Sequence, residues 1–342
     1  MSGVQQVEVG PDEGDQRLDR WLKRRFPQMG QGRIEKACRK GEIRIDGARA
    51  KPATRVATGQ IVRVPPLPDA GAAPPPAAPK ARVSEADARM IRERVIWRDD
   101  HLLALDKPAG LAVQGGTNTE RHLDGLAEAL RFDAEAPPRL VHRLDKDTSG
   151  VLLMARTRRA AAGAAAAFRA RETRKIYWAV VAGTPSPRMG TVRYGLVKGP
   201  GERMETVHPA EVDGVEGAKR ATTDYAVIDD LGGRAAWVAL VPITGRTHQL
   251  RAHMAALGHP IVGDGRYGGR GQENLGDGWG AMLGGEVSRK LHLHARSLAF
   301  DHPVTGRRVS ISAPLPDHMR RTWDMVGWRE GDAPPDPFEE IA

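Results

Sequence analysis

Apolar residues near the start of the chain recur at the spacing of an amphipathic helix. Between residues 17 and 26 they fall on one helical face and basic residues fall on the other. The apolar positions are Leu18, Trp21, Leu22 and Phe26. A second amphipathic segment, residues 32–40, stops before Gly41, and glycine favours the left-handed conformation that often ends a helix. Two alternating stretches, 42–47 and 59–64, predict short strands, so this end of the chain is expected to fold as a small α+β module.

The rest of the chain has a different pattern. From about residue 92, short apolar strands alternate with turns rich in Gly and Pro, and helical patterns are few. The expected strands include 102–105, 151–154, 177–181 and 236–241, and the expected helices are 121–131, 157–171 and 250–257. This mixture predicts an α+β domain with a mixed, largely antiparallel sheet over residues 92–326. Residues 327–342 combine prolines with acidic side chains and are expected to be a disordered tail.

A proline-rich segment separates the two parts. Residues 65–79 contain seven prolines and no aromatic residue, a composition that forms neither helix nor sheet. We therefore expect residues 66–91 to be an extended Pro/Ala-rich linker. A ligand for a proline-binding domain is the alternative, but no other sequence feature supports it.

Charge indicates what the first module binds. The chain carries 52 Lys and Arg against 43 Asp and Glu, a net charge of +9. Residues 13–65 alone hold 14 basic and 6 acidic residues, a net charge of +8. A compact basic module is typical of nucleic-acid binding, because neutralising phosphates releases condensed counterions. A solvated basic face is the alternative interpretation.

Several functional classes lose their main signature. The single cysteine, Cys38, excludes a disulfide framework and a cysteine-based metal cluster. No apolar run approaches the ~18–20 residues that span a bilayer, and the N-terminus lacks a secretory signal, so a cytoplasmic protein without membrane contact is expected. Phosphate-binding, dinucleotide-binding and serine-hydrolase motifs are missing. A metal site at His292 and His294 remains an alternative, although no carboxylate stands beside them at a known ligand spacing.

Two segments are candidates for chemistry. In the first, residues 140–153, Asp145 follows an apolar run and precedes Thr-Ser-Gly and a second apolar run. This pattern indicates either an acid held rigidly in a loop between two strands or an ordinary capped turn. A kinase catalytic loop has a different residue order and needs further motifs that are missing here. In the second segment, hydrogen-bond donors crowd the start of the predicted helix 250–257, and burying them is costly without anionic partners. They are Arg246, His248, Gln249, Arg251 and His253.

These segments resemble the RluA-type pseudouridine synthases. The shared motifs are His-Arg-Leu-Asp-x-x-Thr-Ser-Gly at 142–150, Gly-Arg-Thr-His-Gln-Leu-Arg-x-His at 245–253, and Gly-His-Pro-Ile-x-Gly-Asp at 258–264. Further matches are Asp-Lys-Pro-Ala-Gly at 106–110, Arg-Lys-Ile-Tyr at 174–177 and Leu-His-Ala-Arg-Ser-Leu-Ala-Phe at 293–300. The first module, over residues 14–65, is similar to the S-four (alpha-L) RNA-binding domain.

The resemblance implies isomerisation of uridine to pseudouridine, with no metal and no cofactor. It assigns the catalytic carboxylate to Asp145, which can act at the anomeric carbon as a nucleophile or assist a glycal route. Tyr177 is expected to stack on the uracil and help move the carbon-5 proton, although a core tyrosine is the alternative. Arg251 is expected to supply positive charge beside Asp145, which must stay ionised. Leu298 is expected to form an apolar wall of the pocket.

The resemblance also implies RNA contacts. On the catalytic domain they are expected from His142, Arg143, Thr148, Arg246, His248 and Gln249, of which His142 and Arg143 contact RNA or brace their loop. On the basic module the expected contacts are Arg20, Arg24, Arg33, Lys36, Lys40 and Arg44. The expected partner is RNA of the large ribosomal subunit or its precursor particle, bound by a monomer. A synthase acting on transfer RNA and a non-catalytic RNA-binding protein are the alternatives.

Overall fold

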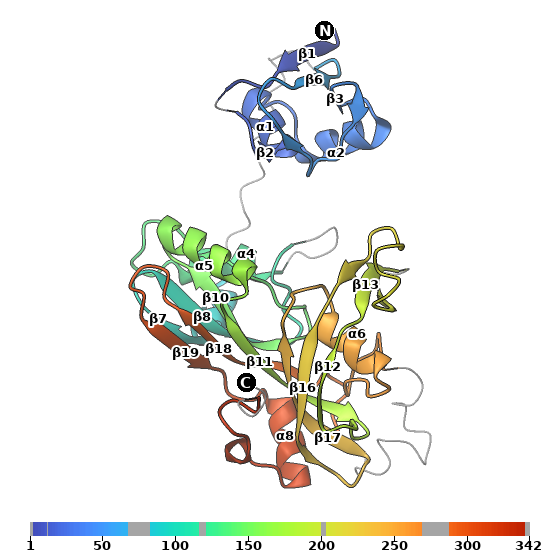
Figure 1. Ribbon diagram of the computed structural model, residues 1–342. Coiled ribbons are helices and arrows are strands. Elements are labelled where there is room, and N and C mark those ends of the chain that lie inside the picture. Colours follow the sequence, from blue (N-terminus) through green and yellow to red (C-terminus); the bar gives the residue numbers. More distant parts are fainter. Residues whose placement is uncertain are drawn as a thin grey trace. The chain divides into compact units, whose positions relative to one another are not determined.

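The chain divides into two compact units, Met1–Arg82 and Val83–Ala342. A computed structural model describes residues 3–11, 13–67, 83–115, 121–199, 203–268 and 287–338 (Figure 1). Each unit has its own hydrophobic core.

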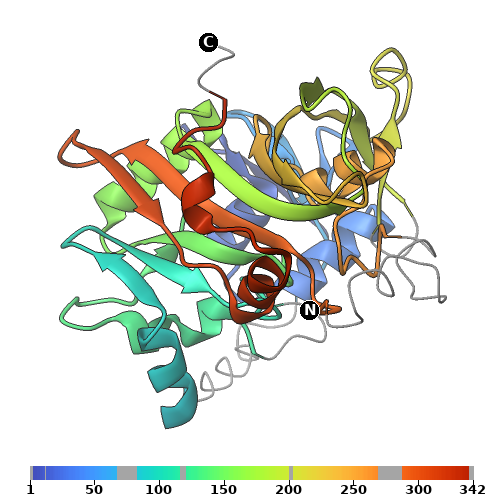
Figure 2. The same cartoon turned by 90° about the horizontal axis from the view of Figure 1, so that it is seen from below.

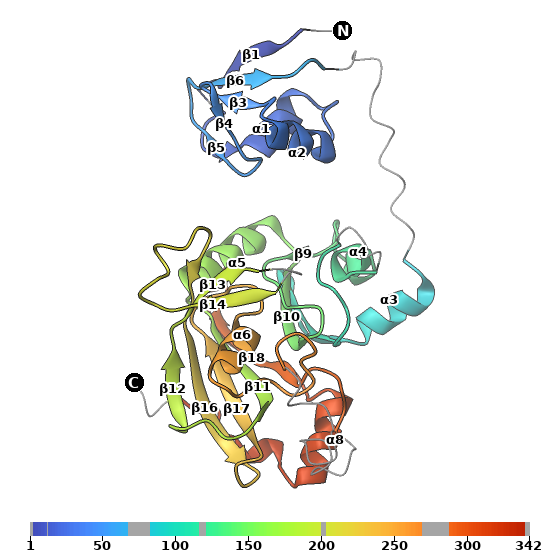
Figure 3. The ribbon, with the colours of Figure 1, turned by 90° about the vertical axis from the view of Figure 1, so that its right-hand side faces the viewer.

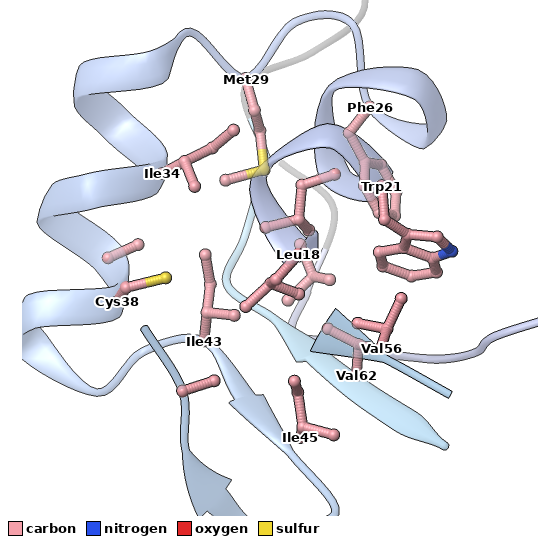
Figure 4. Close-up of a cluster of buried hydrophobic side chains, with 14 of the residues drawn as sticks. Leu18, Trp21, Phe26, Met29, Ile34, Cys38, Ile43, Ile45, Val56 and Val62 are labelled. Atoms are coloured by element: carbon pink, nitrogen blue, oxygen red, sulfur yellow. The ribbon is translucent and has the colours of Figure 1, made fainter. Parts of the chain in front are cut away.

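The first unit packs two helices on a small antiparallel sheet (Figure 3). The helices are α1 (Leu18–Arg25) and α2 (Gln31–Lys40), and the sheet order is β1 (Gln5–Glu8), β6 (Ile61–Val64), β3 (Arg44–Ile45) and β4 (Ala48–Arg49), with β2 (Gln16–Arg17) paired to β5 (Arg55–Val56). Figure 4 shows the apolar faces of both helices meeting between helices and strands. Strand β1 pairs along β6, so the unit begins earlier than the predicted residue 14. Its polar, alternating sequence carries little signal by itself.

A ten-stranded sheet forms the centre of the second unit (Figures 1 and 2). Its order is β12 (Met189–Val192), β16 (Thr223–Asp230), β17 (Ala235–Pro242), β11 (Arg174–Ala182), β18 (Leu293–Asp301), β10 (Ser149–Ala155), β8 (Leu102–Lys107) and β7 (Val95–Arg98), while β19 (Arg308–Ser312) pairs with β18 and β9 (Arg139–Leu140) with β10. A separate small sheet contains β14 (Met204–Val207), β13 (Gly195–Lys198) and β15 (Lys219–Arg220). Within the described part of the chain only β10 and β18 pair in parallel, which confirms the predicted α+β class.

Helices cover this sheet. They are α3 (Glu85–Arg92), α4 (Leu123–Leu126), the 3-10 turn η1 (Ala127–Leu130), α5 (Arg158–Ala170), α6 (Gln249–Ala256), α8 (Asp317–Val326) and the 3-10 turn η4 (Glu330–Asp332). Small residues let α5 approach the sheet, since Ala160 packs in one cluster with Val151 and Leu153. Helix α8 inserts Trp323 against Trp237 of β17, with ring centroids 5.1 Å apart. None of the helices in the described ranges is long and apolar enough to cross a membrane.

Three predicted boundaries are corrected by packing. Helix α3 falls inside the predicted linker 66–91 and buries Ile91 in the second unit's core, so that unit begins before residue 92. The predicted helix 121–131 is reduced to the short α4 followed by a 3-10 turn. The predicted disordered tail was wrong as far as residue 338, because Trp328 and Phe338 are buried in a tryptophan-rich cluster. Burial of these two aromatic side chains orders the segment despite its neighbouring prolines.

Strand pairing brings the two candidate segments together. Ala295 of β18 pairs with Gly150 of β10 on one side and with Tyr177 of β11 on the other. Two strand spacings, roughly 10 Å, therefore separate Tyr177 from the start of β10. Gly150 has φ +107°, and a Cβ there would lie 2.2 Å from the Ala295 carbonyl oxygen. Glycine is thus required where the loop carrying Asp145 enters the sheet.

Candidate active site

A cavity of about 540 Å³ opens where this loop, β11, the end of β17 and α6 meet. Eight of the predicted site residues line it: Asp145, Tyr177, Arg251, His142, Arg143, Thr148, Arg246 and Gln249. Six Lys or Arg side chains line the cavity, and Asp145 is its single carboxylate among the described residues. The arrangement favours an anionic substrate.

The Asp145 side chain is half-buried and chemically available. Its backbone carbonyl accepts a hydrogen bond from the Thr148 N–H at 3.2 Å, which closes a turn. Its carboxylate accepts no hydrogen bond and forms no ion pair within the described ranges. A carboxylate held in a cavity without a protein partner is poised to meet a substrate.

Lys107, at the end of β8, anchors the loop that carries Asp145. This side chain is fully buried, and its Nζ donates to the carbonyl oxygens of Pro108 (3.0 Å), Leu111 (2.9 Å) and Lys146 (2.9 Å). Burial lowers the pKa of Lys107 to about 7, against the opposing charges of Asp147, Asp145 and Asp106. The Lys-Pro-Ala-Gly motif marked this position in the sequence, but its role as a tie between two loops depends on contacts that the sequence does not show.

Tyr177 faces the same cavity from β11. Burial raises the pKa of its phenol far above the ordinary value, and the negative charge of Asp145 raises it further. Tyr177 therefore stays a neutral phenol at physiological pH. Its ring packs against two core clusters and also lines the cavity, so Tyr177 belongs to the core and is also accessible from the cavity.

Arg251 makes a different ion pair from the expected one. Its Nε and Nη2 donate to the two carboxylate oxygens of Asp264, each at 2.7 Å, and the Asp264 side chain has no exposed surface. Burial acts to lower the pKa of Arg251, but the hydrogen bonds and charge of Asp264 raise it, with a further contribution from Asp145. The charge of Asp145 thus reaches Arg251 through space, while Asp264 holds the guanidinium in place. The Gly-Asp pair at 263–264 belongs to one of the shared motifs, but the sequence alone does not show that Asp264 is the partner of Arg251.

Two of the predicted RNA contacts, His142 and Gln249, also brace the site through bonds within the protein. The His142 Nε2 accepts a hydrogen bond from the Leu153 N–H at 2.8 Å, and its ring stacks on Phe168 with centroids 4.3 Å apart. Burial lowers the pKa of His142 to about 3, so this ring is neutral. The Gln249 amide is fully used within the protein. Its oxygen accepts from Thr244 Oγ1 (2.6 Å) and the Arg246 N–H (3.1 Å), and its nitrogen donates to Thr222 O (2.8 Å) and Thr223 Oγ1 (2.9 Å).

Two further predictions do not place a side chain in the cavity. His248 adopts the left-handed conformation, φ +51°, and its Nδ1 lies 3.2 Å from the Tyr267 hydroxyl. Leu298 is 2% exposed and packs in the core with Val151 and Phe300. A β-bulge between Ile176 and Tyr177 shifts the β11–β18 register, and Leu293 lines the cavity instead.

The alternative metal site does not form at His292 and His294. Both ring nitrogens of His292 have protein partners, Lys290 O at 2.8 Å and Thr322 Oγ1 at 2.9 Å. Those of His294 lie 2.9 Å from Ser149 Oγ and 3.3 Å from Ala313 O. Hydrogen bonding within the core accounts for both residues.

The six predicted RNA contacts of the basic module fall into two groups. Arg20, Arg24 and Lys36 are exposed and form no ion pair with any residue that the structure describes. The other three have partners within the module: Arg33 donates to Pro66 O (2.8 Å), Lys40 lies 3.8 Å from Glu42, and Arg44 donates to Gly41 O (3.2 Å) and Gly47 O (3.0 Å). The cations that form no ion pair with a described residue therefore lie on α1 and α2.

Comparison with known proteins identifies the family of the chain. A family model described as RNA pseudouridylate synthase matches residues 101–256. The chain is 33% identical over 318 residues to ribosomal large subunit pseudouridine synthase C of Vibrio cholerae, covering 93% of this chain and 95% of that protein. It is 35% identical over 321 residues to the protein of the same name from Escherichia coli O157:H7, with the same coverage. The solved structure of human RNA pseudouridylate synthase domain containing 4 aligns with a TM-score of 0.58 at 28% identity, covering 70% of this chain and 95% of that one. This chain belongs to the RluA-type family of RNA pseudouridine synthases, enzymes that isomerise uridine in RNA.

Proposed function

We propose that this protein converts specific uridines of large-subunit ribosomal RNA to pseudouridine in the cytoplasm, with Asp145 as the catalytic carboxylate. The observation that carries the proposal is the unpartnered Asp145 carboxylate, which shares one cavity with Tyr177 and a set of cations. No other acid lines this cavity among the described residues.

The reaction is balanced within the substrate. The bond between uracil N1 and ribose C1′ breaks, the uracil turns, and a bond from C5 to C1′ forms, after which the C5 proton moves and N1 regains one. Asp145 serves either by attacking C1′ or by assisting a glycal route, and in both cases the carboxylate is regenerated. The chemistry therefore needs no external oxidant or group donor.

Tyr177 and Arg251 support this carboxylate. A neutral Tyr177 suits stacking against the uracil better than accepting a proton, so its raised pKa favours the stacking role. The C5 proton then needs another acceptor, and Asp145 is the available carboxylate among the cavity residues described. Arg251, held by Asp264, contributes positive charge to the cavity that contains Asp145.

The names of the relatives and the basic module support a ribosomal substrate. The relatives from Vibrio cholerae and Escherichia coli O157:H7 are named for the large ribosomal subunit and match over nearly their whole length. The unoccupied cations of α1 and α2 add an RNA grip that is separate from the cavity. A non-catalytic role is disfavoured because Asp145, Tyr177 and Arg251 all line the cavity.

The test is to map pseudouridine in RNA from cells that lack the protein. We expect one or more pseudouridines of large-subunit ribosomal RNA to disappear and to return with the wild-type chain but not with Asp145→Asn. Unchanged ribosomal RNA together with a lost transfer-RNA pseudouridine would overturn the substrate assignment.

A further inference from the structure

One wall of the cavity consists of cations without acidic partners. Arg169 and Arg171 stand at the C-terminal end of α5, and Lys175 lies in β11 two residues before Tyr177. Within the described part of the chain none of the three forms an ion pair, including with Glu172, which follows Arg171 directly.

Two of these cations, Arg171 and Lys175, repel each other. Burial lowers the pKa of Lys175, and the charge of Arg171 lowers it further, so the two side chains are close enough to disfavour each other's charge. The charge of Lys175 also contributes to lowering the pKa of His142, after the larger effect of burial. Like charges gathered without a counter-charge are unfavourable until an anion joins them.

The wall is held rigidly against the catalytic loop. Phe168 of α5 stacks on His142, which belongs to that loop, and Lys175 Nζ lies 5.9 Å from the Phe168 ring centroid. His142 in turn accepts a hydrogen bond from the β10 backbone at Leu153. Arg171 has φ +64°, the left-handed conformation that ends α5. The end of α5 therefore keeps a fixed place relative to Asp145.

We propose that Arg169, Arg171 and Lys175 form a phosphate-binding wall that grips the RNA backbone next to the uridine in the cavity. This inference rests on the proposed function and adds a binding subsite to it. RNA phosphodiesters are the anions that must accompany a uridine into this cavity. A base must leave its stack to reach an enclosed carboxylate, and fixed backbone contacts offset that cost.

Helix α5 offers a matched experiment. Arg169→Gln/Arg171→Gln removes two charges at the cavity end, and Arg158→Gln/Arg159→Gln removes two exposed charges from the other end, roughly 15 Å away. RNA binding would be measured against salt with a transcript of the ribosomal RNA segment that contains the mapped uridine. Losing two phosphate contacts should reduce the slope of log affinity against log salt by about 1.4 to 1.8. The Arg158/Arg159 pair should keep the wild-type slope.

Two further measurements separate binding from folding and from catalysis. Arg169→Lys/Arg171→Lys should restore most of the salt slope, because charge rather than helix capping is at issue. Arg158→Gln/Arg159→Gln, outside the cavity, should keep wild-type single-turnover pseudouridine formation at saturating RNA, whereas the Gln pair at the cavity end should lose affinity and also rate, because its contacts offset the cost of flipping the base. The proposal would be overturned if both variant pairs reduced the salt slope equally, or if the Arg169→Gln/Arg171→Gln pair did not reduce it. Because Asp145→Asn should abolish turnover without changing the slope, failure of the wall and failure of the proposed function give different results.

Discussion

The buried pair of Arg251 and Asp264 allows a direct test of how the active site is held. Replacing Arg251 with Met leaves a carboxylate with no exposed surface and without its bidentate partner. Removing one member of a buried pair typically costs ~3–5 kcal/mol. Asp264 keeps hydrogen bonds from the backbone N–H groups of Arg266 (3.0 Å) and Tyr267 (3.1 Å), so we expect a loss in the free energy of unfolding near the lower end, about 3 kcal/mol.

A double-mutant cycle identifies the partner. Arg251→Met/Asp264→Asn should be less destabilised than the sum of the singles by roughly 2 kcal/mol, because both singles break one interaction. Arg251→Met combined with Asp145→Asn should be additive within about 0.5 kcal/mol, since those side chains share no direct contact. Denaturant unfolding followed by tryptophan fluorescence reports mainly on the second unit, which contains six of the seven tryptophans. A coupling to Asp145 as large as that to Asp264 would refute the ion pairing described above.

Three other predictions concern the supports of the site. Lys107→Met leaves three carbonyl oxygens without their donor and should lower the free energy of unfolding by roughly 3 kcal/mol while RNA binding persists; a loss below about 0.5 kcal/mol would contradict this. Burial lowers the pKa of His292 and of His294 from 6.5 to about 3, so as the pH falls the unfolded chain takes up their protons before the folded chain does. The free energy of unfolding should therefore fall as the pH drops from 6.5 toward 3, by roughly 3 kcal/mol for each histidine at pH 4. A thermal midpoint that does not change over that range would contradict this prediction. Ending the chain at residue 328 removes Asp336, whose carboxylate accepts from Arg174 at 2.8 and 2.7 Å, and should lower both the thermal midpoint and turnover, because Arg174 begins the strand that carries Tyr177; wild-type values for both would show that the segment is dispensable.

Local patterns predicted most of the elements that build the site. The apolar run at 151–154 lies within β10, and the helical spacing at 250–257 corresponds closely to α6. The motifs placed Asp145 in a loop between two strands, because an apolar run on each side of a polar turn has few other solutions. These features depend on neighbours close in the chain.

Long-range partners were harder to predict. Arg251 pairs with Asp264 because the chain turns after α6 and returns Asp264, 13 positions later, to Arg251. The motifs do not show whether Asp145 or Asp264 will lie nearer to Arg251. Leu298 packs in the core rather than in the cavity wall, because the face of β18 that it occupies is set by the pairing of that strand with distant strands. The prolines of the tail predicted disorder, whereas Trp328 and Phe338 pack against tryptophans that are distant in the sequence.

The role of Asp145 is tested most directly by comparing it with an acid two residues away. Asp145 lines the cavity, while Asp147 is exposed on the same loop and does not line it. Asp145→Asn should form no pseudouridine in single-turnover assays on the mapped ribosomal RNA segment, and its dissociation constant for that RNA should stay within a few-fold of wild type, because phosphate contacts dominate affinity. Asp147→Asn should retain activity close to that of wild type. Pseudouridine formation by Asp145→Asn, or equal inactivity of the two variants, would contradict the assignment of Asp145 as the catalytic carboxylate.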